Sequence, residues 1–483
     1  DNSGNIWTST VNVVLNSPVL EHTTFTIDDA GAHDGGLVIG GGTWNSNNSN
    51  LTVDGVLDVD GGNLSIGTSA VSCAKLIVES GDTISAAHSS NALTVTGAGI
   101  GNNRSIDFTG AISGTLNIIT THTGTREDDL SASSGSINHL TVNHASAVIT
   151  ISTTAITVAG DLTITTGTLD TDSSNNYALT VAGKTYIGNG GAADSATLTC
   201  NDSDISLGAA YTSDYALVVT GGGTFVGGTG THTIGSLYMQ DNANAKVTLT
   251  DDVTTISSEY TTGNYNIVIY DDATFDNADG TVTITGPTSQ IYVQSSATVQ
   301  VGQPRLHNLT INGSSNTFTL GHNLTVEGVL TITAGTLDTT SLSNFALTVT
   351  KHIDVTGTLT GNASAISTGT MTLRDNSTLT STGTITVTGN DKANSPTGSG
   401  WVWRNQETDG TAFAPSAGTV HFVGTGIANG YIGESKFYNF IFDITGGGDI
   451  QWVDATGDTM TIGGDMTIVE GQFKRNAESD TLV

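Results

Sequence analysis

The residues best suited to chemistry in this chain are carboxylates gathered in short loops. The run YDDATFDNADG carries Asp271, Asp272, Asp276 and Asp279. Calcium ions take six to eight oxygen ligands, which carboxylate, amide and carbonyl groups on turns can supply. The run lacks the glutamate that completes a helix–loop–helix calcium loop, and Asp and Asn also favour turns for conformational reasons alone. The sequence therefore predicts either a Ca²⁺ site at these four residues or a plain polar turn.

A second candidate site lies where two tryptophans precede an arginine. In an extended strand Trp401 and Trp403 point to the same side, and Arg404 follows directly. Exposed indoles near an arginine can stack on sugars or anchor a partner protein. The same residues also suit the capping of an exposed hydrophobic stack, or the packing of a seam between domains. Both interpretations remain open at the level of sequence.

The sequence contains no catalytic motif beside these two candidate sites. The sequence contains no G-x-S-x-G, H-E-x-x-H or P-loop motif. Its 13 lysines and arginines are scattered, whereas carbohydrate-cleaving β-helices need paired carboxylates, or Ca²⁺ with a basic residue. We predict that the chain is not an enzyme and that it needs no cofactor other than Ca²⁺.

These side chains must be positioned by a repeated element. A fourteen-residue pattern alternates apolar and polar residues with the period of a β-strand, and glycine interrupts it twice. Repetition of this kind is typical of stacked units. The copies are LTVDGVLDVDGGNL at 51–64, ITVAGDLTITTGTL at 156–169, LTVEGVLTITAGTL at 324–337 and MTIGGDMTIVEGQF at 460–473.

A further strand pattern gives the length of one turn. YALTV and FALTV follow two of the copies at the same offset, so that Leu179 follows Ile156 by the same number of positions as Leu347 follows Leu324. Short strands joined by tight turns suit a solenoid. We predict an all-β fold, a parallel β-helix (β-solenoid) with coils of about 23 residues and a short C-terminal β-rich unit. A string of antiparallel sandwiches is the alternative, although the regular Trp and Cys spacing of such domains is absent.

One region breaks the rhythm of the repeat. Residues 391–417 contain two of the five prolines and two of the five tryptophans. We therefore predict a β-solenoid body over residues 1–390, a loop or inter-domain break over 391–417, and a C-terminal β-rich repeat unit over 418–483.

The charge of the chain narrows its range of partners. Asp and Glu number 45 against 13 Lys and Arg, which gives a net charge of −32 and disfavours nucleic acid and anionic membranes. No apolar run reaches transmembrane length, so we expect no membrane insertion.

Cys73 and Cys200 are either buried thiols or one long-range disulfide. The start at Asp1, without Met, suggests processing of a secreted precursor, and a fragment of a longer chain would look the same.

The strings LTVxGxLTITxGTL and GTVxFxGTG…FYNFxF are similar to repeats of bacterial secreted β-solenoid surface proteins. The resemblance is to filamentous-haemagglutinin-like and autotransporter-passenger-like solenoids, and to phage fibre repeats. It covers most of the chain and is one of repeat style. It implies a right-handed parallel β-helix used as an adhesin, stalk or fibre at a cell or virion surface, and it transfers no catalytic residue.

Strand edges at the ends of a solenoid must be capped or joined to another chain. The segment NIWTSTVNVVL offers a strand for such joining through Ile6, Trp7, Val11 and Val13. We predict an extracellular structural or adhesive protein, a self-associating solenoid rod that acts as filament subunit, surface stalk or fibre and that contacts surface glycans. The alternative is a carbohydrate-binding or carbohydrate-cleaving β-helix spike.

Thr-x-Thr strings occur in the repeat, for example at 163–165 and 331–333. Two interpretations fit them. They either form flat threonine ladders like those of ice-binding solenoids, or they hold solvent-facing threonines that are present because of their β propensity.

Overall fold

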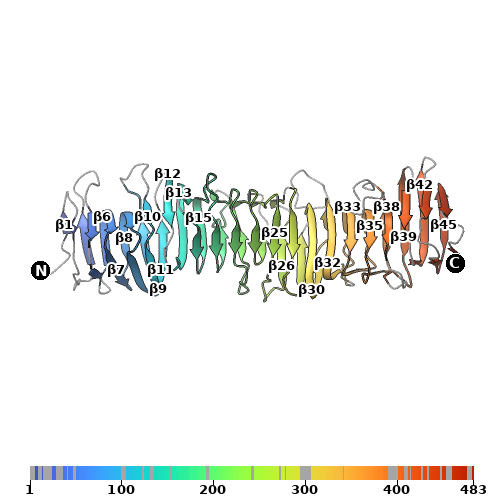
Figure 1. The fold of residues 1–483 in the computed structure, drawn as a ribbon, viewed down its shortest axis with the longest axis horizontal. Helices are drawn as coiled ribbons and strands as arrows, with labels where there is room; N and C mark the ends of the chain where they lie inside the picture. Colours follow the sequence, from blue (N-terminus) through green and yellow to red (C-terminus); the bar gives the residue numbers. More distant parts are fainter. Residues whose placement is uncertain are drawn as a thin grey trace. The chain divides into compact units, whose positions relative to one another are not determined.

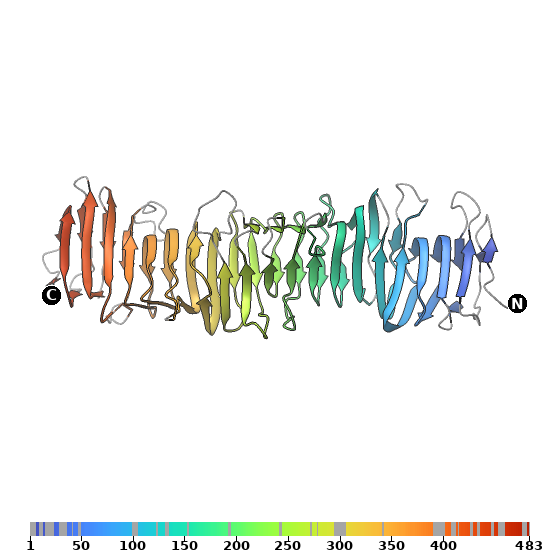
Figure 2. The same cartoon turned by 180° about the vertical axis from the view of Figure 1, so that it is seen from behind.

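The structure of this chain is a computed structural model (Figures 1 and 2). The chain divides into two compact units, Asp1–Thr250 and Asp251–Val483, which we call unit 1 and unit 2. The residues that the structure describes are 6–8, 13–14, 24–28, 36–40, 42–46, 50–98, 105–121, 124–130, 135–151, 154–191, 195–240, 244–270, 273–277, 279–293, 306–340, 342–389, 401–406, 412–413, 415–425, 428–431, 435–445, 449–452, 459–475 and 481–482.

Within each unit the described residues form β-strands and turns (Figures 1 and 2). These residues contain no helix that is long and apolar enough to cross a membrane. The strands pair in parallel and stack as a β-solenoid with turns of roughly 23 residues. The predicted all-β parallel β-helix is therefore confirmed.

In unit 1 each strand pairs with the strand one turn further along the chain. Strand β14 (Ile156–Val158) pairs with β16 (Leu179–Val181), and Ile156 lies opposite Leu179. The next partners are β19 (Ile205–Leu207) and β22 (His232–Ile234). The offset between Ile156 and Leu179 in the sequence is thus the pairing register of the first two strands.

Unit 2 repeats the arrangement. Leu324 in β31 (Leu324–Val326) lies opposite Leu347 in β33 (Leu347–Val355). From β33 the ladder continues through strands that lie further along the chain. They are β35 (Ile366–Leu373), β37 (Thr384–Val387), β39 (Thr419–Thr425), β42 (Asn439–Thr445) and β45 (Met466–Glu470).

The ladder of unit 2 continues across the segment 391–417. Strand β37 before the segment pairs directly with β39 after it. Within the segment, β38 (Trp401–Asn405) pairs with β35 and with β40 (Ala428–Tyr431). The boundaries at 390 and 418 stay a prediction, and both flanks of the segment belong to one ladder.

The core of each turn consists of the inward-facing residues of the repeat. In the second copy Ile156, Val158, Leu162, Ile164 and Leu169 are all buried, and the residues between them face outward, as the burial pattern of each strand shows. Side chains alternate across a strand, so the apolar period of two in the sequence becomes one continuous interior. Burial of these side chains is the main favourable term in the folding free energy.

The first glycine of the repeat lies where two turns approach closely. The N–H of Gly328 donates to the carbonyl of His307 in the preceding turn (2.6 Å), and the next N–H, of Val329, donates to Oδ1 of Asn308 (2.9 Å). A Cβ on Gly328 would lie 2.2 Å from that oxygen. Only glycine fits the corner without displacing the side chain that caps it.

The same corner occurs in two other copies. The N–H of Asp161, after Gly160, donates to Nδ1 of His139 (2.9 Å), and the N–H of Asp465, after Gly464, donates to Oδ1 of Asn439 (3.0 Å). The repeat thus specifies both a glycine and, one turn earlier, a side-chain acceptor for the N–H that follows it. Such an acceptor matters because a backbone donor left without a partner costs free energy.

Candidate functional site

The described part of the predicted calcium loop is a turn stabilised by an asparagine. The buried side chain of Asn277 donates to the carbonyl of Gly280 (3.1 Å) and accepts from the N–H of His307 (2.6 Å). Asp276, in β27 (Thr274–Asp276), is exposed. So is Asp279, whose carboxylate lies 3.8 Å from Nε2 of His307.

Asp271 and Asp272 lie outside the described residues. Among the residues that the structure describes, no group of three or more His, Cys, Asp or Glu side chains is placed to hold a metal ion. The Ca²⁺ site at Asp271, Asp272, Asp276 and Asp279 therefore stays a prediction.

The second candidate site, formed by Trp401, Trp403 and Arg404, includes one residue of the hydrophobic core, Trp403. Trp403 is 0% exposed and lies against the rings of Phe413, Phe422 and Phe437, with ring centroids 5.4, 6.1 and 5.6 Å from its own. Its Nε1 donates to Oγ of Ser435 (3.4 Å). Because this indole is enclosed on all sides, a ligand at the surface cannot reach it.

The other two residues of this candidate site, Trp401 and Arg404, are not shown to be core residues. Arg404 is half-buried, on the strand position after Trp403. The backbone of Trp401 pairs with Asn429, with a shift in register before Trp403, and its side chain lies outside the described part of the structure. A binding role for Trp401 and Arg404 stays a prediction, without the paired indoles that the sequence suggested.

The residues predicted to join chains together pair within their own chain. Ile6 and Trp7 lie in β1 (Ile6–Thr8), which pairs with β3 (Thr24–Asp28). Val13 lies in β2 (Val13–Val14), which pairs with β4 (Gly36–Ile39). Val11 is outside the described residues. These strands therefore use one edge within the fold, and their role in assembly stays a prediction.

A polar corner in unit 1 gathers four side chains at the end of a strand. Oδ1 of Asp170 accepts from Nδ2 of Asn201 (2.8 Å). The hydroxyl of Thr171 donates to the carbonyl of Cys200 (2.6 Å) and accepts from the hydroxyl of Ser203 (2.8 Å). Thr171 and Ser203 are fully buried, so the corner fixes the bend between two strands through satisfied hydrogen bonds.

Unit 2 contains the same corner. Oδ1 of Asp338 accepts from Nδ2 of Asn362 (2.6 Å), and the hydroxyl of Ser364 donates to that of Thr339 (2.8 Å). Asn201 and Asn362, the matching asparagines, adopt left-handed backbone conformations, with φ of 49° and 47°. Asparagine tolerates this region better than most residues. The sequence analysis missed the corner, although the shared string LDT at 169–171 and 337–339 marks it.

A hollow of about 290 Å³ lies beside the corner of unit 2. All of its lining residues are neutral, and all except Ala363 have an amide or a hydroxyl side chain, so the lining carries no carboxylate, amine, imidazole or thiol. Such a surface can donate and accept hydrogen bonds but has no group for acid–base chemistry near neutral pH. The lining residues are Asn344, Asn362, Ala363, Thr380, Ser381 and Thr382.

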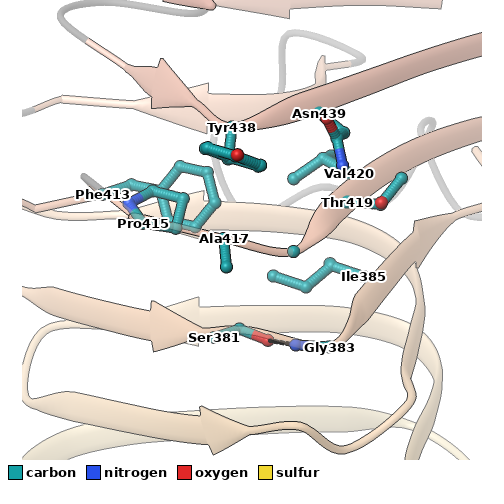
Figure 3. Close-up of a pocket in the computed structure, with 11 residues that line it drawn as sticks. Ser381, Gly383, Ile385, Phe413, Pro415, Ala417, Thr419, Val420, Tyr438 and Asn439 are labelled. Atoms are coloured by element: carbon teal, nitrogen blue, oxygen red, sulfur yellow. Dashed lines mark hydrogen bonds between the residues drawn. The ribbon is translucent and has the colours of Figure 1, made fainter. Parts of the chain in front are cut away.

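A second hollow in unit 2 is lined by both apolar and polar residues (Figure 3). Phe413, Pro415 and Tyr438 lie around it with Ile385, and the N–H of Gly383 donates to the hydroxyl of Ser381 at its rim (3.2 Å). It has no room for a water molecule. It is therefore a packing feature of the turns around β37 and β39, with no space for a ligand.

The two cysteines are free and buried, which confirms the thiol alternative. Burial raises the pKa of the Cys73 thiol to about 12 and raises the pKa of Cys200 as well. Both therefore stay protonated at physiological pH, and a protonated thiol is a poor nucleophile.

An acidic group lies on the outer face of unit 1. Burial raises the pKa of Asp58 to about 6, and repulsion from Asp60, Glu79 and Asp82 acts in the same direction, against the attraction of Lys75. Since the folded-state pKa is raised, this carboxyl favours the folded state at low pH and opposes it as the pH rises through 6.

His232 makes the stability of unit 1 sensitive to acid. Its ring is fully buried, edge-on to Phe225 (5.7 Å), and burial lowers its pKa from 6.5 to about 4. The unfolded chain takes up a proton first as the pH falls. Stability should therefore drop between about pH 6.5 and 4, by roughly 3 kcal/mol, since a tenfold difference in proton affinity equals about 1.4 kcal/mol.

Denaturant unfolding measured from pH 7 to pH 4, on the native chain and on His232→Phe, checks this prediction. The variant should lose less stability than the native chain over that range. Equal slopes in the two proteins would show that His232 does not titrate as described.

No protein-family model, curated protein or solved structure matches this chain.

Proposed function

We propose that this chain is a structural or adhesive extracellular protein, a self-associating β-solenoid that serves as filament subunit, surface stalk or fibre. The observation that supports it best is the repeated corner at Gly160, Gly328 and Gly464, where the same backbone hydrogen bonds recur in distant parts of the chain. Recurrence of one geometry at these three corners favours uniform stacking, which a scaffold requires.

The placement of the reactive side chains supports the same proposal. Cys73, Cys200, His232 and Trp403 are all buried, and each contributes to packing. The extracellular location follows from the resemblance of the repeat to secreted surface proteins. Carbohydrate binding is the second candidate, and the neutral polar hollow beside Asn362 favours it.

Self-association has a candidate surface on β45. This strand pairs with β42, and Ile468 and Val469 on it are 51% and 63% exposed. Exposed apolar side chains on a strand promote pairing with a further strand. We take that strand to come from a second copy of the chain, because a parallel strand added at this edge would continue the pairing of β42 with β45.

Sedimentation of the full chain over a range of concentrations tests this surface. We expect Ile468→Asn with Val469→Asn to weaken self-association by roughly tenfold or more, since both apolar contacts are lost. Leu342→Asn is the matched control, because Leu342 is 94% exposed in a turn of the same unit, and it should leave assembly unchanged.

Two outcomes would contradict the role of β45. One is a native chain that stays monomeric at every concentration, which would favour the carbohydrate-binding alternative. The other is equal weakening by the control. Deletion of residues 1–15 tests the N-terminal strand in the same assay, and unchanged assembly would remove that strand from the proposal.

A further inference from the structure

Four consecutive turns of unit 2 present threonines in two parallel columns. Strands β30 (Asn308–Leu320), β32 (Val329–Asp338), β34 (Thr358–Asn362) and β36 (Thr378–Ser381) pair in parallel. The central residues Phe318, Leu337, Leu359 and Leu379 are buried, so the residues on either side of each face outward. One column is Thr317, Thr336, Thr358 and Thr378, and the other is Thr319, Asp338, Thr360 and Thr380.

We call these eight residues the threonine array. The single exception, Asp338, has a structural reason of its own. Its carboxylate accepts hydrogen bonds from the N–H of Thr340 (2.7 Å) and from Asn362 (2.6 Å) in the polar corner. Everywhere else in the array the residue is threonine.

General β propensity does not account for this uniformity. Other residues of high β propensity, such as Val, Ile and Tyr, also occur on strands and could stand at some of these positions. The equivalent face of unit 1 shows the expected mixture, because Val226 and Lys246 stand among its threonines. That face consists of Thr168, Thr197, Thr224 and Lys246 in one column and Asp170, Thr199, Val226 and Thr248 in the other.

The array has fixed spacings in two directions. Neighbouring strands lie about 4.8 Å apart, and alternate residues on one strand lie about 6.6 Å apart. Threonine is stiff at χ1, and the buried layer beneath is close-packed. Each hydroxyl and methyl group therefore holds a defined position in a two-dimensional lattice.

A partner that is itself periodic in two dimensions gains most from such a lattice. A small molecule or a flexible chain would contact only a few positions at once. A crystal face of ice offers rows of water oxygens that repeat on a similar scale, hydroxyls can join its hydrogen-bond network, and methyl groups order the water between them. We propose that the threonine array of unit 2 binds ice.

This inference rests on the array and is independent of self-association. The test freezes a solution of the full chain slowly onto an ice surface and measures the fraction of protein taken into the ice. Thr358→Tyr places a bulky ring in the middle of the array. Thr197→Tyr makes the same change at the equivalent position in unit 1 and is the matched control.

We expect uptake of the native chain into ice, uptake lower by roughly tenfold in Thr358→Tyr because the contact is lost over several turns, and native uptake in the control. Thr358→Val replaces the hydroxyl with a methyl group of similar size and should lower uptake less, so it decides the case if the tyrosine variant unfolds. Exclusion of the native chain from ice, or equal loss in both tyrosine variants, would overturn the proposal. So would binding to crystalline cellulose or chitin, but not to ice, with the same sensitivity to Thr358→Tyr.

Discussion

Replacement of Trp403 by alanine will lower the free energy of unfolding of unit 2 by roughly 3–5 kcal/mol. The indole is fully enclosed by three phenylalanine rings, so its removal leaves a cavity and loses the edge-to-face ring contacts. The turns around β38 are expected to separate first, because each turn of a solenoid is stabilised mainly by its neighbours.

Urea unfolding followed by circular dichroism measures this effect. Trp403→Phe should lose less than half as much stability as Trp403→Ala, since the phenyl ring fills most of the cavity. Tyr438→Ala is the matched control, because Tyr438 is an aromatic residue of the same unit with a partly exposed side chain. A loss below about 1 kcal/mol in Trp403→Ala, within the range of an ordinary surface change, would show that the indole is not a core residue.

Replacement of Gly335 by alanine will be similarly costly. This second glycine of the repeat has φ of +80°, and a Cβ there would lie 2.2 Å from the carbonyl oxygen of Gly313 in the preceding turn. Left-handed strain costs about 1–2 kcal/mol, and forcing the turns apart costs about 1–3 kcal/mol more. The expected total loss is therefore roughly 2–5 kcal/mol.

Gly389→Ala separates these two contributions. Gly389 also has positive φ (70°), but the nearest atom to an added Cβ, Cγ1 of Val402, is 3.4 Å away. This variant should lose only the strain of about 1–2 kcal/mol. The same urea unfolding experiment compares the two, and equal losses would show that the close approach of the turns at Gly335 contributes nothing.

The fold could be predicted from the sequence because one short pattern determines it. The offset between Ile156 and Leu179 became the pairing register. The strand ends before Gly160, as expected, while positive φ occurs at the second glycine, Gly167. Local geometry of this kind is encoded in neighbouring residues, so a single sequence contains it.

The candidate sites could not be predicted fully, because contacts between different turns are not encoded in the local sequence pattern. Alternation places Trp403 on a face but does not reveal that Phe413, Phe422 and Phe437 from other turns cover it. The sequence analysis raised threonine ladders at 163–165 and 331–333 but did not find the positions of the threonine array, for a different reason. The turns that carry its first column, Thr317, Thr336, Thr358 and Thr378, differ in length, so no single fixed period aligns them.

Electron microscopy of the purified full chain tests the central claim, self-association into a scaffold, most directly. The account predicts uniform filaments whose number rises with protein concentration, and loss of the filaments in a calcium chelator would add Ca²⁺ to the joints between chains. Discrete single particles at every concentration, with or without calcium, would contradict it.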